Sequence, residues 1–85
     1  MKIQKESVCG TLQSNDCTIR LTPAESCQVS LDSPVAYEFG DQIQELVKKV
    51  LQEEEVENAS VAIEDRGALD CTIEARLRTA IRRAQ

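Results

Sequence analysis

The sequence contains no histidine and no tryptophan, and Tyr37 and Phe39 are its only aromatic residues. Without histidine, the side chain that most often acts as a general base near neutral pH is missing. Two aromatic rings are too few to form a platform on which nucleic acid bases stack. The formal net charge of −5 points the same way, because contact with nucleic acid needs a basic face. We therefore expect neither a free-standing enzyme nor a nucleic-acid-binding protein.

The chain also lacks the length for several domains. At 85 residues we expect one domain over residues 1–85, with one core and no space for a deep substrate pocket. No stretch approaches the length of a transmembrane helix, and the opening Met1-Lys2-Ile3 does not lead into an apolar run. We therefore expect no signal peptide, no contact with a membrane and a cytoplasmic location.

Patterns of metal ligands are missing as well. The four cysteines do not form a C-x-x-C pair, and without histidine they make no zinc-ligand set. We therefore expect no metal site, and thiols that stay reduced and serve mostly as small core residues. These cysteines are Cys9, Cys17, Cys27 and Cys71.

Two segments that alternate apolar and polar residues, 8–12 and 17–21, predict a β-hairpin. Its predicted turn is Ser14-Asn15, because asparagine tolerates the positive φ that a type I′ turn requires. A four-residue loop over residues 13–16 would keep the same pairing of the strands. In either case the Ser14 hydroxyl is expected to point into water.

The predicted register of this hairpin pairs Leu12 with Cys17 and Val8 with Leu21. It places Cys9 on the outer face, where Thr11 and Thr18 oppose each other beside Arg20. The face expected to be buried carries Val8, Gly10, Leu12, Cys17, Ile19 and Leu21.

The next two elements are a strand at residues 27–31 and a helix from about residue 34 to 54. Apolar residues recur in this helix at helical spacing, and Pro34 suits its first position. Gly40 interrupts the pattern, so the helix either bends there or begins at Asp41; we favour one helix because the period continues through the glycine. The stripe expected to face the core is Val35, Phe39, Ile43, Leu46, Val47 and Val50.

The last two elements are a strand at residues 60–64 and a helix over about 68–84, in which Glu74 and Arg78 form a favourable i,i+4 pair. The core stripe expected for this helix is Leu69, Ile73, Leu77, Ala80, Ile81 and Ala84. The element order is therefore β-β-β-α-β-α. It predicts an α+β fold, a mostly antiparallel sheet with two helices packed on one face.

Few side chains offer chemistry. A serine in a turn normally serves the turn alone, and without a histidine or lysine nearby Ser14 cannot be a serine-histidine type nucleophile. If Ser14 has a function, it is as an attachment point or phosphosite. We interpret Asp65 and Asp70 as turn and cap residues.

Arginine concentrates in the last quarter of this acidic chain. Such a set is usually a solvated helix face with local ion pairs, and Arg76 can pack its stem beside the apolar stripe while its head reaches outward. The alternative is a docking surface for an acidic partner or for the phosphates of a tethered group. The arginines are Arg66, Arg76, Arg78, Arg82 and Arg83.

Four segments together span nearly the whole chain and carry a family resemblance. They are Met1-Lys2-Ile3, Val8-x-Gly10-Thr11-Leu12-x-Ser14-x-Asp16, Phe39-Gly40-Asp41-x-Ile43 and Gly67-Ala68-Leu69-Asp70-Cys71-x-Ile73-x-Ala75-Arg76-Leu77. In this order and spacing, they resemble the acyl carrier protein of citrate lyase, its gamma subunit. The sequence departs from the family at Asn15, where glycine or another small residue is common.

The resemblance implies a carrier function without catalytic residues. In that family the serine of the Ser-x-Asp turn, which matches Ser14 here, carries 2′-(5″-phosphoribosyl)-3′-dephospho-coenzyme A through a phosphodiester bond. The thiol of this arm holds acetyl and citryl thioesters while citrate is cleaved to oxaloacetate and acetate. The implied partners are the alpha (transferase) and beta (lyase) subunits and a separate transferase that installs the arm.

Two alternatives stay open. One is the related carrier subunit of malonate decarboxylase, which is thought to bear the same arm, although the segment Gly67-Ala68-Leu69-Asp70-Cys71 favours citrate lyase. The other is a non-catalytic adaptor subunit that docks through its arginine-rich helix, with Ser14 unmodified.

Overall fold

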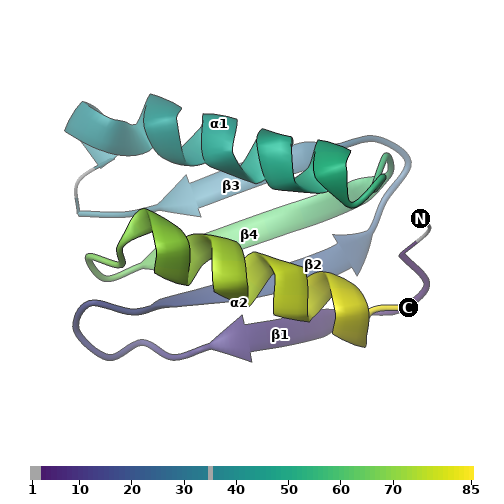
Figure 1. Cartoon of the computed structure of the whole chain (residues 1–85), viewed down its shortest axis with the longest axis horizontal. Coiled ribbons are helices and arrows are strands. Elements are labelled where there is room, and N and C mark those ends of the chain that lie inside the picture. Colours follow the sequence, from purple (N-terminus) through teal and green to yellow (C-terminus); the bar gives the residue numbers. More distant parts are fainter. Residues whose placement is uncertain (1–2, 35) are drawn as a thin grey trace.

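The computed structural model describes residues 3–34 and 36–85, so the positions Met1, Lys2 and Val35 of the patterns above lie outside the described residues. The elements follow one another in the predicted order β-β-β-α-β-α (Figure 1). Their bounds are β1 Ser7–Gly10, β2 Cys17–Pro23, β3 Gln28–Asp32, α1 Ala36–Glu53, β4 Ala59–Asp65 and α2 Asp70–Arg83.

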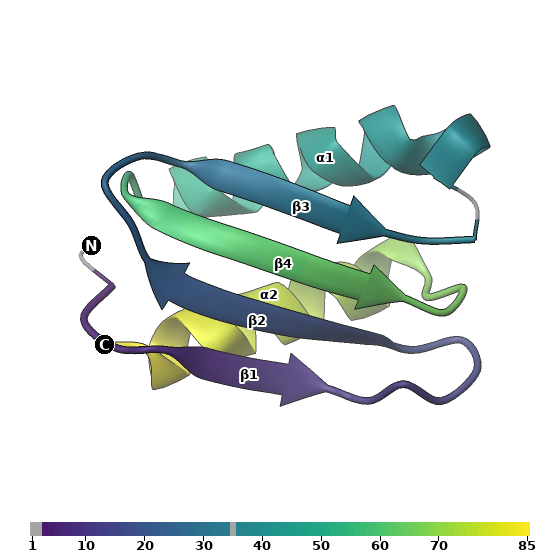
Figure 2. The ribbon, with the colours of Figure 1, turned by 180° about the vertical axis from the view of Figure 1, so that it is seen from behind.

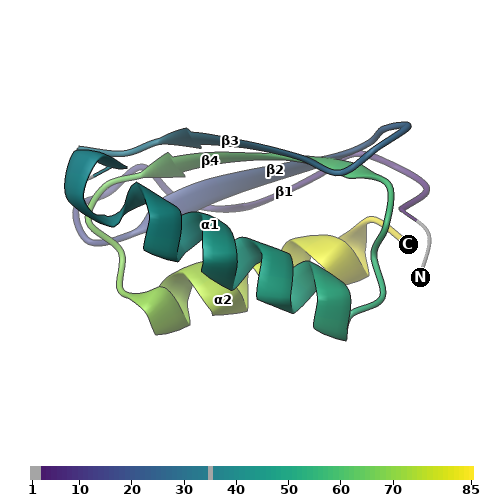
Figure 3. The ribbon, with the colours of Figure 1, turned by 90° about the horizontal axis from the view of Figure 1, so that it is seen from above.

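The four strands form one sheet in the order β1-β2-β4-β3 (Figure 2). The pairs β1–β2 and β2–β4 are antiparallel, as expected, whereas β3 and β4 are parallel. The sheet is therefore mixed, because α1 returns the chain to the end of the sheet where β3 began, as crossover connections between parallel strands do. Both helices cover the same face of the sheet, and the other face has no helix on it (Figure 3). The predicted α+β architecture is confirmed.

Helix α1 runs through Gly40 without a break, which confirms one helix and excludes a start at Asp41. Ile43 and Val47 of its predicted core stripe are buried. Phe39 is not, because 44% of its surface is exposed, so its assignment to the core was wrong. Phe39 is the fourth residue of α1 and precedes Ile43, the first buried residue of the described stripe, by one turn.

Helix α2 buries almost all of its predicted stripe between the sheet and α1. Leu69 is the exception, with 69% of its surface exposed. It was expected inside the helix, but it precedes the first residue and serves as the N-cap with extended backbone. The buried core of the described residues is Ile3, Cys9, Cys17, Ile19, Leu21, Ile43, Val47, Val50, Leu51, Val56, Ala59, Val61, Ile63, Ile73, Leu77, Ala80, Ile81 and Ala84.

The predicted hairpin register is wrong by one residue. Cys9, not Gly10, lies opposite Ile19, and Ser7, not Val8, lies opposite Leu21. Since neighbouring side chains on a strand point to opposite faces, this shift turns the whole of β1 over. Cys9 is therefore buried, contrary to expectation, while Val8 is 38% exposed on the outer face.

Two contacts favour the observed register. The Ser7 hydroxyl, turned inward, donates to the Ala80 carbonyl of α2 at 2.6 Å. Gly10 has a φ of +111° and lies so close to β2 that a Cβ there would sit 1.8 Å from the Cys17 carbonyl oxygen. The strand ends at this glycine, so Thr11 belongs to the connection, and Thr18 lies opposite Gly10 instead of Thr11.

Neither helix of the described residues combines the length and apolarity that crossing a membrane would need.

Candidate functional site

The candidate site is the β1–β2 connection, residues 11–16, in which Ser14 is exposed. The Asp16 amide donates to the Gln13 carbonyl at 3.2 Å, so residues 13–16 form a β-turn with Ser14 and Asn15 at its centre. The predicted turn position and the exposure of Ser14 are confirmed. The turn is not type I′, however, because only Asn15, with a φ of 65°, has a positive φ among its central residues.

The Asp16 carboxylate joins this turn to helix α2. Arg76 donates to it twice, from Nε to Oδ1 at 3.1 Å and from Nη2 to Oδ2 at 2.9 Å. The Thr11 hydroxyl donates to Oδ2 at 2.6 Å, and the Cys17 amide donates to Oδ1 at 2.7 Å. Arg76, then Thr11 and then the Cys17 amide hold the pKa of the Asp16 carboxyl far below its usual range. One carboxylate thus binds together both ends of the connection and a distant helix.

A second set of hydrogen bonds attaches the turn to the β4–α2 connection, residues 66–69. The Asn15 amide donates to the Arg66 carbonyl at 2.8 Å, and the Arg66 amide donates to the Asp16 carbonyl at 2.9 Å. Both residues that follow Ser14 are therefore held by backbone contacts. Ser14 therefore lies in a loop whose backbone is hydrogen-bonded to a neighbouring connection.

Asp65 organises the β4–α2 connection in turn. Its buried carboxylate accepts the Ala68 amide at 2.8 Å and the Gly67 amide at 3.2 Å through Oδ1, and the Ser33 hydroxyl at 2.7 Å through Oδ2. This confirms Asp65 as a turn residue. Asp70 is not a cap, because the N-cap of α2 is Leu69, which makes no side-chain capping bond. As the first residue of α2, Asp70 instead complements the helix dipole.

Comparison with known proteins decides the family. A family model described as "Malonate decarboxylase delta subunit (MdcD)" matches residues 4–84. The citrate lyase acyl carrier protein of Treponema denticola is 58% identical over 99% of this chain and 97% of its own length. The protein of that name from Haemophilus influenzae (strain PittEE) is 45% identical over 99% of this chain and 88% of its own length.

The chain belongs to the citrate lyase acyl carrier protein family. It is thus a non-catalytic carrier by family, in agreement with the resemblance drawn from its sequence segments. A chain in the crystal structure of a Pseudomonas malonate decarboxylase hetero-tetramer in complex with malonate shares the fold, with a TM-score of 0.83. That likeness covers 98% of this chain and 87% of the other, at 17% identity, and it shows the fold alone.

In this family member the arginines serve mainly internal contacts. Arg78 bonds to Glu74, which confirms the predicted i,i+4 pair, and also bonds to Glu53 of helix α1. Arg83 donates to the Val8 carbonyl at 3.1 Å. The head of Arg76 was expected to reach outward, but it binds Asp16. Four of the five arginines of this set therefore make contacts within the chain: Arg66, Arg76 and Arg78 form ion pairs, and Arg83 binds a backbone carbonyl.

Sequence reasoning missed the link between Asp16 and Arg76, because the two residues are 60 positions apart. A signal was present. Asp16 ends one of the segments that carry the family resemblance, and Arg76 lies in another. Because Asp16 and Arg76 have opposite charges, a contact between these two segments could have been considered.

The four cysteines divide evenly. Cys9 and Cys17 are buried and Cys27 and Cys71 are exposed, and none of them is in a disulfide. The expectation of mostly core cysteines therefore holds for half of them. Burial raises the pKa of the Cys17 thiol to about 11.

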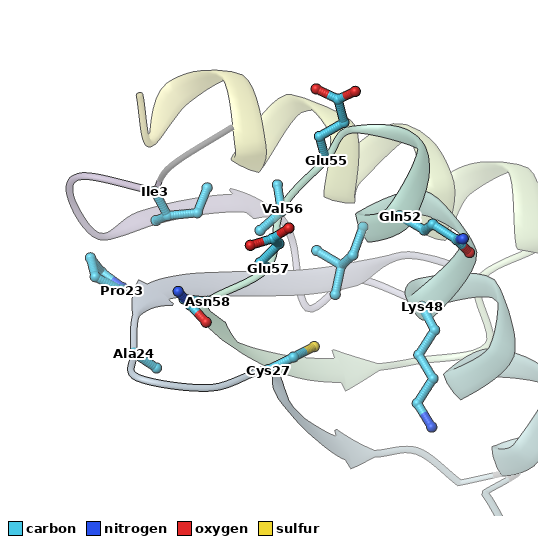
Figure 4. A pocket seen from close by; sticks show the side chains of 11 residues that line it. Ile3, Pro23, Ala24, Cys27, Lys48, Gln52, Glu55, Val56, Glu57 and Asn58 are labelled. Atoms are coloured by element: carbon cyan, nitrogen blue, oxygen red, sulfur yellow. The ribbon is translucent and has the colours of Figure 1, made fainter.

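A hollow of the described surface lies at the end of the molecule opposite the β1–β2 connection (Figures 1 and 4). Its volume is about 920 Å³, and it separates the β2–β3 connection from the end of α1. Cys27 and Lys48 are among the residues that line it (Figure 4). It is remote from the β1–β2 connection and contributes nothing to the candidate site. Among the described residues, no group of three or more Cys, Asp or Glu is placed to hold a metal ion.

Proposed function

We propose that the chain is the acyl carrier domain of a citrate lyase complex, over residues 1–85, and that Ser14 is the residue to which its prosthetic group is attached. The observation that carries this proposal is the exposed Ser14 hydroxyl on a turn that Asp16 and Arg66 anchor from two sides. The chain belongs to a family of acyl carriers, and a carrier needs a residue to which its acyl-bearing group is attached.

The residues present fit the group implied by the family, 2′-(5″-phosphoribosyl)-3′-dephospho-coenzyme A. A phosphodiester requires one accessible hydroxyl, and the described turn offers Ser14 in that state. In the attachment, the Ser14 oxygen forms a new bond to phosphorus, the leaving group of an activated phosphate donor departs with its bonding electrons, and the hydroxyl proton passes to a base of the installing transferase. Once bound, the group supplies a thiol that holds acetyl and citryl thioesters.

The role of the chain in this scheme is to hold and present the arm. Citrate cleavage to oxaloacetate and acetate is then the work of the alpha (transferase) and beta (lyase) subunits, in the cytoplasm. Tethering the thioester converts encounters between separate molecules into encounters at high effective concentration within one complex. A compact support that holds Ser14 at one end suits this task.

Malonate decarboxylase is the second candidate complex. The description of the matching family model and the fold shared with a chain of that enzyme favour it. Citrate lyase is preferred because identity reaches 58% to a citrate lyase carrier and is 17% to the malonate decarboxylase chain. The adaptor alternative is less favoured, because most arginines on which it depends are engaged within the chain.

The test is the intact mass of the protein produced in its native host. We expect the wild-type chain to gain the mass of the arm, located on Ser14 by peptide mapping. Ser14→Ala should fold and assemble but gain no mass and support no citrate cleavage. Ser26→Ala removes an exposed hydroxyl at the opposite end and should be modified as the wild type is. A mass gain that persists in Ser14→Ala, or an unmodified wild type in a host with active citrate lyase, would contradict the proposal.

A further inference from the structure

Three large apolar side chains that the sequence pattern assigns to the core are exposed at the end of the molecule that carries Ser14. Leu12 is 55% exposed, Phe39 is 44% exposed and Leu69 is 69% exposed. We call these three residues the apolar rim. The other large apolar residue that is exposed in the described part of the chain is Val8, on the outer face of the sheet.

The apolar rim and the Ser14 turn belong to neighbouring parts of the chain. Leu12 belongs to the same connection as Ser14, and the bond from the Asn15 amide to the Arg66 carbonyl joins that connection to residues 66–69. Leu69 and Phe39 line one shallow depression of about 420 Å³. Figures 1 and 2 show the three parts of the chain at the same end of the sheet: the β1–β2 connection, the β4–α2 connection and the start of α1.

The position of Leu69 argues that its exposure has a function. It is the N-cap of α2, where Ser, Thr, Asp and Asn are strongly preferred because their side chains accept the free amides of the first turn. Leucine makes no such bond here, and it buries little of its surface. Departures from the local rules of stability are expected at functional sites.

Charge around the rim indicates the kind of partner. Glu38, Asp41 and Asp70 are exposed in the first turns of the two helices. They suit the positive ends of the helix dipoles, and they outnumber the one exposed cation of the β4–α2 connection, Arg66, which pairs with Glu64. The start of α1 and the β4–α2 connection are therefore acidic on balance. A complementary partner therefore presents an apolar patch bordered by basic residues.

We propose that the apolar rim is the docking surface for the transferase that attaches the prosthetic group to Ser14. This inference rests on the proposed function. Before modification there is no arm, so the transferase must bring its donor within about 3 Å of the Ser14 oxygen itself. The subunits that act on the finished thioester meet the far end of the arm and have no such need.

The size of a protein interface indicates that a contact centred on Ser14 includes the rim. A stable interface covers about 800 Å² on each protein. The molecule is 30 Å long, and its two shorter extents are 22 and 18 Å. The β1–β2 connection, which contains Ser14, lies at one end of the long axis (Figure 1). A footprint centred on Ser14 is therefore larger than the end of the molecule and includes the rim.

The experiment measures the rate at which purified apo protein gains mass when it is incubated with the purified transferase and its phosphate donor. Phe39→Ser and Leu69→Ser are each expected to raise KM for the carrier about tenfold with kcat nearly unchanged, because an apolar contact in the complex is lost. Val8→Ser removes an exposed apolar side chain elsewhere and should leave both constants near wild type. Added salt should raise KM for the wild type, because it screens the acidic surroundings of the rim.

Thermal unfolding separates docking from stability. Leu69→Ser introduces a preferred N-cap residue, so its Tm should equal or exceed that of the wild type even as modification slows. Wild-type KM in both rim variants would overturn the docking proposal, while a mass gain on Ser14 would leave the proposed function intact. Rim variants that are modified normally but fail to assemble with the lyase subunits would assign the rim to those subunits instead. Absence of any mass gain on wild-type Ser14 would contradict the proposed function itself.

Discussion

Asp16 is the residue on which the geometry of the Ser14 turn depends most. It sits two positions after the serine, and its carboxylate accepts hydrogen bonds from Thr11, from the Cys17 amide and from Arg76 of helix α2. A bidentate arginine fixes direction as well as distance. The turn that presents the attachment point is thereby oriented relative to the core.

This contact predicts a pH dependence of stability. The folded state holds the pKa of Asp16 below its ordinary value of 3.8, so the ionised carboxylate stabilises the fold above that pH, and this contribution is lost as the pH falls below it. Asp16→Asn should therefore be less stable than the wild type at pH 7, and the difference should shrink as the pH falls from about 4 toward 2.

Urea unfolding at a series of pH values measures this difference. Asp41→Asn, on the exposed surface of α1, is the matched control and should lose less stability at pH 7, because the charge of Asp41 interacts only with the helix dipole. A difference between Asp16→Asn and the wild type that stays constant down to pH 2 would contradict the role assigned to the charged carboxylate.

Strand β1 shows how one glycine determines the placement of an element. Gly10 ends the strand with a positive φ and lies directly against the Cys17 carbonyl. This close approach occurs in the register that turns Cys9 and Ser7 toward the core. Because β1 ends at Gly10, residues 11–16 form the connection that carries Ser14. The length of that connection is a consequence of where β1 stops.

We therefore expect Gly10→Ala to destabilise the protein by about 2–3 kcal/mol or more, because the added Cβ would displace the backbone of β2 and would also strain a positive φ. Gly67→Ala is the matched control. Its φ is +89°, but the nearest atom to the added Cβ is 3.5 Å away, so only the backbone strain of about 1–2 kcal/mol applies. Chemical denaturation compares the two variants, and equal losses would contradict the steric argument.

At the scale of the whole molecule, the residues that stabilise the fold and the residues assigned a function lie in different places. The helices and the inner face of the sheet form one core, while the Ser14 turn and the apolar rim occupy one end of the long axis. Modification at that end does not require the core to open. The four cysteines can be used to test whether the core is closed, because two of them lie in the core and two lie on the surface.

Alkylation with iodoacetamide at pH 8 should label Cys27 and Cys71 and spare Cys9 and Cys17 in the folded protein. With its pKa raised to about 11, the Cys17 thiol is ionised in only about one molecule in a thousand at this pH, and both inner thiols are shielded by burial. Peptide mass mapping identifies the labelled positions. All four should react in strong urea, and rapid labelling of Cys9 or Cys17 without urea would show that the core is not closed as described.

The order of elements, the α+β class, the exposed serine turn and the core stripes of the helices, apart from Phe39 and Leu69, could be predicted from the sequence. They depend on local signals: apolar spacing, alternation and the conformational preference of Asn15, which act over a few residues. The family could also be identified from short segments, of which the one containing Ser14 is the most informative. The assignment of the prosthetic group to Ser14 remains a proposal.

Only the tertiary structure decided the rest. The register of β1 depends on the bond of Ser7 to Ala80, 73 positions away, and on the close approach of Gly10 to β2, whereas the alternation of residues 8–12 favoured the opposite face of this strand. The exposure of Phe39 and Leu69 follows from where the helices end relative to the sheet, which periodicity does not contain. The bond between Asp16 and Arg76 joins residues that meet only after the sheet and α2 have packed.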